Sequence, residues 1–242
     1  MANIALAVLE SALRDKKLDR TLTTALPPME QPADACAQTG IAAVDACLRN
    51  GVPRGQLSEL TGPRSAGSTT LLLQTMATAT QRGELVALVD TFDRLDVASM
   101  AAAGADLGRV LWIRGQASGP AEWAIDRALK ALNLVLQAGG FGLVAIDLAD
   151  VPGAMLRRIP FTTWLRVQRA VEGRDTACVL VAPEPIARSA GGLTLTLTGR
   201  TSWTGSSARP RVAGAELKMR VVSPRRRVDG EVAMSASSVA LA

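Results

Sequence analysis

From about residue 39 onward, short apolar runs alternate with amphipathic stretches. The apolar runs are nearly continuous, which is typical of strands buried on both faces of a parallel sheet. Apolar residues at helical spacing separate them, most clearly in residues 121–137, where Ile125 and Leu129 share one face. The expected strands are 56–61, 84–90, 110–113, 141–147 and 176–182, and the expected helices are 69–81, 121–137 and 162–171.

The two ends of the chain have different patterns. Ile4, Val8 and Leu9 recur at helical spacing before a proline-rich stretch at 25–35, which predicts an amphipathic arm helix and a linker. Near the other end, two runs alternate apolar with polar residues, which predicts an antiparallel hairpin over 193–203 and 213–223. We therefore expect an arm and linker (1–38), a core domain (39–227) and a flexible tail (228–242).

These elements define an α/β fold class. Strands that alternate with helices favour a mostly parallel twisted sheet flanked by helices, here extended by the C-terminal antiparallel hairpin. The chain has 242 residues, of which 48% are hydrophobic, so it is long enough to bury a sizeable core.

The composition excludes several kinds of chemistry. The chain contains no His and no Tyr, so it has no His general base, Ser-His-Asp triad or His metal ligand. Cys36, Cys47 and Cys178 have neither the spacing of a zinc site nor the even number of a disulfide framework, and we expect them to pack as small apolar groups. We also find no secretory pattern and no apolar run long enough to span a membrane, so we expect a cytoplasmic bacterial protein.

The positive charge is concentrated in the last third of the chain. The formal net charge is +5, but residues 151–230 hold 14 basic against 5 acidic side chains, a balance of +9. Such a segment is either a solvated face or a surface for nucleic acid or an acidic protein. With seven aromatic residues in the whole chain, a surface built on repeated base stacking is not expected.

An incomplete phosphate-binding loop follows the first expected strand. Gly62, Gly67 and Thr69 match the pattern G-x-x-x-x-G-K-[ST], but Ser68 replaces the lysine that reaches the β- and γ-phosphates. The backbone N–H groups that attract phosphate are retained, so ATP and Mg²⁺ are expected to bind weakly at most, with no resident cofactor or metal. The nucleotide-binding remnant comprises Gly62, Arg64, Gly67, Ser68, Thr69, Thr70 and Asp147, the last at the end of a buried strand. Arg64 is either a partial substitute for the lysine or an exposed arginine in a turn.

The ordered spacing of several motifs resembles the RecA family. Residues 39–70 contain T-G followed by an apolar-Asp pair, a G-V-P-R-G turn and E-L-T-G-P before the loop. Residues 85–115 are similar to the next RecA stretch, in which a strand ending in Asp leads to a helix, a G-x-D turn and another strand. The resemblance covers roughly residues 39–200 and implies a RecA-like ATPase core.

Two departures from the family pattern affect catalysis. In active members, the residue two positions after the aspartate of the second strand is a glutamate that polarises the attacking water. Here Asp90 is followed by Thr91 and Phe92, and Phe cannot accept a proton. Asp93 is the nearest carboxylate, but a shift of one residue at a strand end turns it to the other side. Together with Ser68, these residues predict a protein that is not an enzyme and has no catalytic residue.

Within the RecA-like proteins, the loop GPRSAGSTT, the short length and the abundance of small residues resemble the ImuA subgroup. That resemblance implies a non-hydrolysing adaptor of SOS-induced error-prone translesion synthesis. Its partners would be an ImuB-type inactive Y-family polymerase relative, an error-prone polymerase and RecA. Ile4, Val8 and Leu9 of the arm are the candidate docking residues, for a partner or for another copy. The alternatives are a weak ATP-dependent DNA-binding filament protein and a SulA-like cell-division inhibitor.

The resemblance also suggests where single-stranded DNA would bind. In RecA, the loops that follow the Asp147-type strand and the next strand line the DNA, and here they correspond to residues 147–160 and 183–192. The candidate DNA-binding residues, including the terminal basic run, are Arg157, Arg158, Arg188, Arg225, Arg226 and Arg227.

Overall fold

The computed structural model describes residues 35–116, 118–187, 192–204, 211–222 and 227–237. The chain divides into two compact units, residues 1–31 and 32–242, and everything described belongs to the second. The predicted arm helix, with Ile4, Val8 and Leu9, therefore lies outside the described residues.

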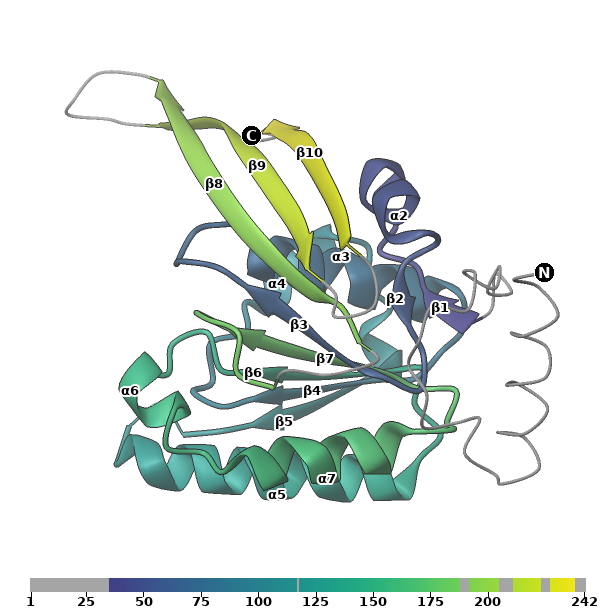
Figure 1. Cartoon of the computed structure of the whole chain (residues 1–242). Helices are drawn as coiled ribbons and strands as arrows, with labels where there is room; N and C mark the ends of the chain where they lie inside the picture. The colour runs from purple at the N-terminus through teal and green to yellow at the C-terminus, as the bar shows by residue number, and fades with distance from the viewer. Residues whose placement is uncertain (1–34, 117, 188–191, 205–210, 223–226, 238–242) are drawn as a thin grey trace, which may run out of the picture. The chain divides into compact units, whose positions relative to one another are not determined.

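The second unit is built on an eight-stranded sheet with the order β10-β9-β8-β3-β7-β6-β4-β5 (Figure 1). The six strands from β8 to β5 are parallel to their neighbours, and β9 and β10 are added in antiparallel fashion. This arrangement confirms the predicted fold class. The strands are β3 (Leu57–Thr61), β4 (Val86–Asp90), β5 (Val110–Arg114), β6 (Leu143–Asp147), β7 (Ala177–Ala182), β8 (Thr194–Thr204), β9 (Arg211–Val222) and β10 (Arg227–Ser237).

Helices cover both faces of the parallel part of the sheet. On one face, α2 (Ala42–Leu48), α3 (Ser68–Gln81) and α4 (Val97–Ala102) contribute to one hydrophobic core. On the other face, α5 (Ala121–Ala138), α6 (Gly153–Leu156) and α7 (Phe161–Val171) contribute to a second core, and Figure 1 shows α5 and α7 lying along the sheet. A short 3₁₀ turn, η2 (Leu107–Arg109), precedes β5.

The two cores explain why the strand segments are apolar without interruption. Along β4, Val86 and Leu88 belong to the core with α3, while Ala87 and Val89 belong to the core with α5. Successive side chains of a strand point to opposite faces, so a strand covered on both sides needs an apolar residue at every position. All five residues of β4 are buried as a result.

The ends of the predicted core domain need two corrections. The linker was expected to reach residue 38, but β1 (Cys36–Ala37) pairs with β2 (Val52–Pro53) in a separate two-stranded sheet. The tail was expected to be flexible over 228–242, but β10 pairs antiparallel with β9 over most of that range. The small and polar composition of 228–237 does not predict a strand. The strand forms because its backbone groups pair with those of the neighbouring strand β9.

The three cysteines carry no disulfide, and Cys36 and Cys178 are buried. The described part of the chain has no group of His, Cys, Asp and Glu side chains that could hold a metal ion. No described helix is long and apolar enough to cross a membrane.

Candidate functional site

The phosphate-loop remnant has the expected strand-loop-helix geometry. Strand β3 ends at Thr61, the loop spans 62–67, and α3 begins at Ser68. Gly67 has a φ of 93°, and Gly62 passes so close to β8 that a Cβ there would lie 2.3 Å from the carbonyl oxygen of Leu197. These two positions therefore require glycine, for backbone conformation and for close approach respectively.

Ser68 does not replace the chemistry of the missing lysine. Its hydroxyl oxygen is buried and has no hydrogen-bond partner within the described structure. A serine hydroxyl carries no charge and is too short to reach a phosphate group beyond the loop. Thr69 and Thr70, in the first turn of α3, are exposed. The loop thus keeps a helix N-terminus and exposed hydroxyls but has no ammonium group.

Arg64 lies at the tip of the loop and is paired with an acidic residue. Its side chain is 80% exposed, and its Nη2 atom lies 2.7 Å from Oδ1 of Asp150, three residues after β6. Arg94, which follows β4, has its Nε atom 3.5 Å from the other oxygen of Asp150. The structure therefore directs Arg64 toward a carboxylate, and an anion at the loop would have to compete with that carboxylate.

Among the carboxylates at the carboxyl edge of the parallel strands, Asp147 has the most strongly shifted pKa. It lies opposite Asp90 in the register of β6 and β4 and accepts a hydrogen bond from the backbone N–H of Ala149 at 2.9 Å. The pKa of Asp147 is raised to about 6, mainly by burial and to a smaller extent by the negative charges of Asp90 and Asp150, against the lowering effect of the Ala149 hydrogen bond.

The other carboxylates near the end of β4 are already engaged. Asp90 accepts hydrogen bonds from the backbone N–H groups of Arg94 and Leu95 and from Nε1 of Trp112, at 2.8 to 3.1 Å. It therefore shapes the loop that follows β4. Phe92 is partly buried and packs against the core beneath α5 and α7.

Asp93 is held by an arginine that sequence reasoning did not identify. Arg114, the last residue of β5, donates from Nε and Nη2 to the two oxygens of Asp93 at 2.8 and 2.7 Å. These hydrogen bonds and the positive charge of Arg114 lower the pKa of Asp93. The guanidinium also lies 4.5 Å from the centre of the Trp112 ring, in a cation–π arrangement. Asp93 is therefore a fixed, ionised partner of Arg114 and not a free base.

The candidate DNA-binding residues are only partly described. Arg157 follows α6, is 63% exposed, and forms an ion pair with Glu184 in the loop after β7. Arg158 is exposed beside it. Arg188, Arg225 and Arg226 lie outside the described residues, and only the backbone of Arg227 is described, as the first residue of β10. Because Arg157 is paired, Arg158 is the candidate that the described structure presents to solvent without a paired acid.

The loop after β7 is anchored by a buried acid that sequence analysis missed. Glu59 in β3 is fully buried, and its Oε1 accepts hydrogen bonds from the backbone N–H groups of Ile186 and Ala187 at 2.7 and 2.8 Å. Its Oε2 accepts from the hydroxyl of Thr194 at 3.2 Å. Strand β3, which leads into the phosphate-loop remnant, thus also fixes both ends of the neighbouring loop.

Comparison with known proteins supports the sequence resemblance. The model of the RecA N-terminal domain family matches residues 11–156, which is more than half of the chain. Relatives named "Protein RecA" include those of Borrelia hermsii (34% identical over 97 residues, 40% of this chain and 25% of the relative) and Clavibacter michiganensis (30% over 142 residues, 57% and 37%). Another is from Thermus thermophilus (30% over 151 residues, 60% and 42%). The chain spans less than half the length of these relatives. The chain belongs to the RecA N-terminal domain family.

Proposed function

We propose that this chain is a RecA-like adaptor that does not hydrolyse ATP and acts in the SOS-induced error-prone translesion synthesis machinery. Its principal partner would be an ImuB-type inactive Y-family polymerase relative, with RecA, an error-prone polymerase and single-stranded DNA as further contacts. The observation that carries the proposal is the end of β4. There Phe92 replaces a glutamate and Asp93 is held by Arg114.

The loss of hydrolysis follows from two independent defects. Phosphoryl transfer depends on positive groups that stabilise charge on the phosphates and on a residue that orients the attacking water. Ser68 supplies no positive charge, and neither Phe92 nor the Arg114-bound Asp93 can orient water. Removing one such electrostatic contribution costs roughly two to three orders of magnitude in rate, and the two losses together leave no turnover of practical size.

The structure offers a surface on which a partner segment could bind. Strand β5 ends the sheet within the described part of the chain, so one row of its backbone N–H and C=O groups has no neighbouring strand. Beside it, a cavity of about 160 Å³ lies between the ends of β4 and β5 and the helix α5, lined in part by Ile113, Ala128 and Ala131. An extended segment that adds a strand to β5 and inserts one small apolar side chain would fit this arrangement.

Strand β5 and helix α5 also carry exposed apolar side chains. Leu111 of β5 is 45% exposed, and Trp123 and Leu134 of α5 are 64% and 67% exposed. Trp123 and Leu134 are eleven residues apart, which places them on one side of the helix. Large exposed aromatic and aliphatic residues are typical anchors of protein interfaces. We call the β5 edge together with Leu111, Trp123 and Leu134 the β5–α5 surface.

Co-expression and co-purification with an ImuB-type protein test the proposal. We expect a stable complex that Trp123→Ala weakens at least tenfold, whereas Leu165→Ala, an exposed leucine on α7, serves as the matched control and leaves it unchanged. Steady-state phosphate release with and without single-stranded DNA is expected to stay at background. Absence of a complex, or equal effects of the two substitutions, contradicts the adaptor role or its assignment to this surface.

The retained loop favours one alternative, a weak ATP-dependent DNA-binding filament protein. The strand-loop-helix geometry and the position of Asp147 would still allow a nucleotide and Mg²⁺ to be held. That alternative requires ATP-dependent assembly on single-stranded DNA, which electron microscopy and light scattering would detect. DNA-stimulated phosphate release that Asp147→Ala abolishes would favour it over the adaptor.

A further inference from the structure

Two exposed arginines share one carboxylate at the carboxyl edge of the parallel strands. Arg64, in the loop between β3 and α3, and Arg94, after β4, contact different oxygens of Asp150 at 2.7 and 3.5 Å. Asp150 follows β6, and β7 lies between β3 and β6 in the sheet, so the Arg64 contact joins loops of strands that are not neighbours. Because one carboxylate contacts both guanidinium groups, a single small anion can reach both of them.

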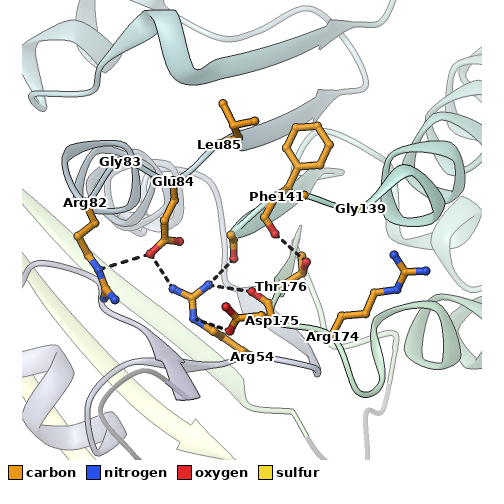
Figure 2. A pocket seen from close by; sticks show the side chains of 12 residues that line it. Arg54, Arg82, Gly83, Glu84, Leu85, Gly139, Phe141, Arg174, Asp175 and Thr176 are labelled. Carbon is orange, nitrogen blue, oxygen red and sulfur yellow. Dashed lines mark hydrogen bonds and ion pairs between the residues drawn. The ribbon is translucent and has the colours of Figure 1, made fainter.

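The exposure of these arginines distinguishes them from an arginine with a structural role. Arg54 lines a pocket of about 630 Å³ at the opposite, amino-terminal edge of the strands (Figure 2). Its side chain is 6% exposed and donates to two backbone carbonyl oxygens and to Glu84, so fixed groups of the protein satisfy it. The side chains of Arg64 and Arg94 are 80% and 63% exposed. A guanidinium has five N–H groups, so both arginines keep donors that a second acceptor can reach.

The contacts with Asp150 can be exchanged for contacts with another anion. Ion pairs between exposed side chains contribute little to stability, because water screens them and both side chains lose freedom. A terminal phosphate group carries about two negative charges and three acceptor oxygens, against one charge and two oxygens for a carboxylate. A phosphate group therefore binds two arginines more strongly than a carboxylate does, although Asp150 has the advantage of being tethered beside them.

We propose that Arg64 and Arg94 form a binding site for the end of a phosphate chain, and that Asp150 occupies this site in the absence of ligand. The ligand chemistry is two or three linked phosphate groups, either as inorganic polyphosphate or as the end of a nucleotide. On binding, the two guanidinium groups exchange the Asp150 carboxylate for phosphate oxygens, and the carboxylate returns to water. Arg64 stands at a variable position of the phosphate-loop pattern and Arg94 lies outside it, so the pattern assigns no role to this pair.

Calorimetric titration of the full chain in metal-free buffer at pH 7 and constant ionic strength tests the site. Inorganic tripolyphosphate is the first probe, and we expect saturable binding. ATP and AMP are the second and third probes, because comparison of ATP with tripolyphosphate shows whether the nucleoside adds affinity. AMP, which has one phosphate group, is expected to bind at least tenfold more weakly than ATP. The absence of saturable binding by tripolyphosphate and ATP, in both the wild type and Asp150→Asn, overturns the proposal.

Replacement of the internal competitor is expected to strengthen binding. Asp150→Asn removes the charge that occupies the arginines, so the affinity for tripolyphosphate is expected to rise at least threefold. Asp126→Asn is the matched control, because Asp126 is an exposed carboxylate on α5 that pairs with Lys130. It is expected to change the affinity less than twofold. Equal gains in the two variants contradict the exchange at Asp150.

Replacement of either arginine is expected to have the opposite effect. Arg64→Ala and Arg94→Ala are each expected to weaken tripolyphosphate binding at least fivefold. Arg169→Ala, an exposed arginine on α7, is the matched control for the loss of one positive charge and is expected to change it less than twofold. Equal effects of Arg64→Ala and Arg169→Ala refute the assignment of the site.

A double-mutant cycle separates exchange from simple repulsion. If Asp150 competes for Arg64, the gain from Asp150→Asn is expected to fall below twofold when Arg64 is also replaced by Ala. An equal gain with and without Arg64 shows that Asp150 acts only through its charge at a distance, and overturns the exchange. Melting temperatures of the ligand-free variants separate all these effects from a loss of fold.

Titration with a single-stranded oligothymidine shows whether the arginines bind nucleic acid instead. A gain in oligothymidine affinity for Asp150→Asn without a gain for tripolyphosphate contradicts the proposal. The inference concerns binding and requires no hydrolysis. Partner binding at the β5–α5 surface is tested separately, so a failure here leaves the adaptor role standing.

Discussion

Asp147→Asn is expected to stabilise the protein at neutral pH. Burial and the neighbouring charges of Asp90 and Asp150 raise the pKa of Asp147 to about 6, whereas an aspartate in an unfolded chain titrates near about 3.9. The folded protein therefore binds this proton more tightly than the unfolded chain. The contribution of Asp147 to stability is most favourable below pH 4, falls as the pH rises from 4 to 6, and is constant above that range.

The size of the effect follows from the two pKa values. Each pH unit between them corresponds to about 1.4 kcal/mol, so the ionised Asp147 lowers the free energy of unfolding at pH 7 by about 3 kcal/mol as an upper bound. Asparagine has the same shape, carries no charge, and can still accept the hydrogen bond from Ala149. Because its amide must find new partners, we expect a net gain of about 1 to 2 kcal/mol at pH 7 and almost none at pH 4.

Urea unfolding followed by tryptophan fluorescence at pH 4, 5, 6 and 7 measures this pattern, since Trp164 lies in the core. Asp150→Asn is the control for loss of a nearby carboxylate. It removes the partner of Arg64 and Arg94 and a smaller cause of the raised pKa of Asp147, so the decline between pH 4 and 6 is expected to shrink but to remain. The reasoning is refuted if Asp147→Asn is less stable than the wild type at pH 7. It is also refuted if the difference between the two does not depend on pH.

Three further predictions concern the loop anchor, the basic segment and the arm. Glu59→Ala is expected to lower the free energy of unfolding by about 3 kcal/mol, because it leaves buried N–H donors without an acceptor. Glu59→Gln keeps an acceptor and is expected to lower it by less than about 1.5 kcal/mol. Equal losses for the two variants in urea unfolding would contradict this prediction. DNA affinity, measured by fluorescence anisotropy, is expected to be independent of DNA sequence and to fall linearly with salt concentration on logarithmic axes. It is also expected to weaken when residues 225–227 are changed to Glu. A salt-insensitive affinity would assign the basic segment 151–230 to a solvated face. Deleting residues 1–30 is expected to leave the melting temperature nearly unchanged and to abolish self-association or partner binding; an unfolded core would show that the arm is structural.

The sequence predicts the parallel strands well because their signal is local. Runs such as 143–147 are apolar at every position, and the requirement for cover on both faces leaves few other interpretations. The hairpin of β8 and β9 follows from alternation, which is again local. Strand β10 has no comparable pattern, because its place is set by pairing with β9.

The interactions that define the candidate site could not be predicted from the sequence, because they join distant residues. Arg114 and Asp93 are 21 residues apart, and Arg54 and Gly142 are 88 residues apart. The hydrophobic periodicity of the sequence does not indicate such contacts, because they depend on which strands are neighbours in the sheet. The motif pattern predicts from Ser68 and Phe92 that two catalytic groups are missing. Only the structure reveals that Asp93, the nearest carboxylate, is bound by Arg114.

Three of the four acidic residues at the carboxyl edge of the sheet hold local backbone or an arginine side chain. Asp90 holds the loop after β4, Asp93 binds Arg114, and Asp150 binds Arg64. In each case a carboxylate stabilises local backbone or an arginine, so the loops at this edge are fixed without nucleotide. Asp147, like Asp90, forms no ion pair with an arginine or lysine side chain in the described structure, and its raised pKa makes it a net cost to stability at neutral pH. Loops fixed in this way would be preorganised for the partner binding that we propose, because their order would not depend on bound ATP.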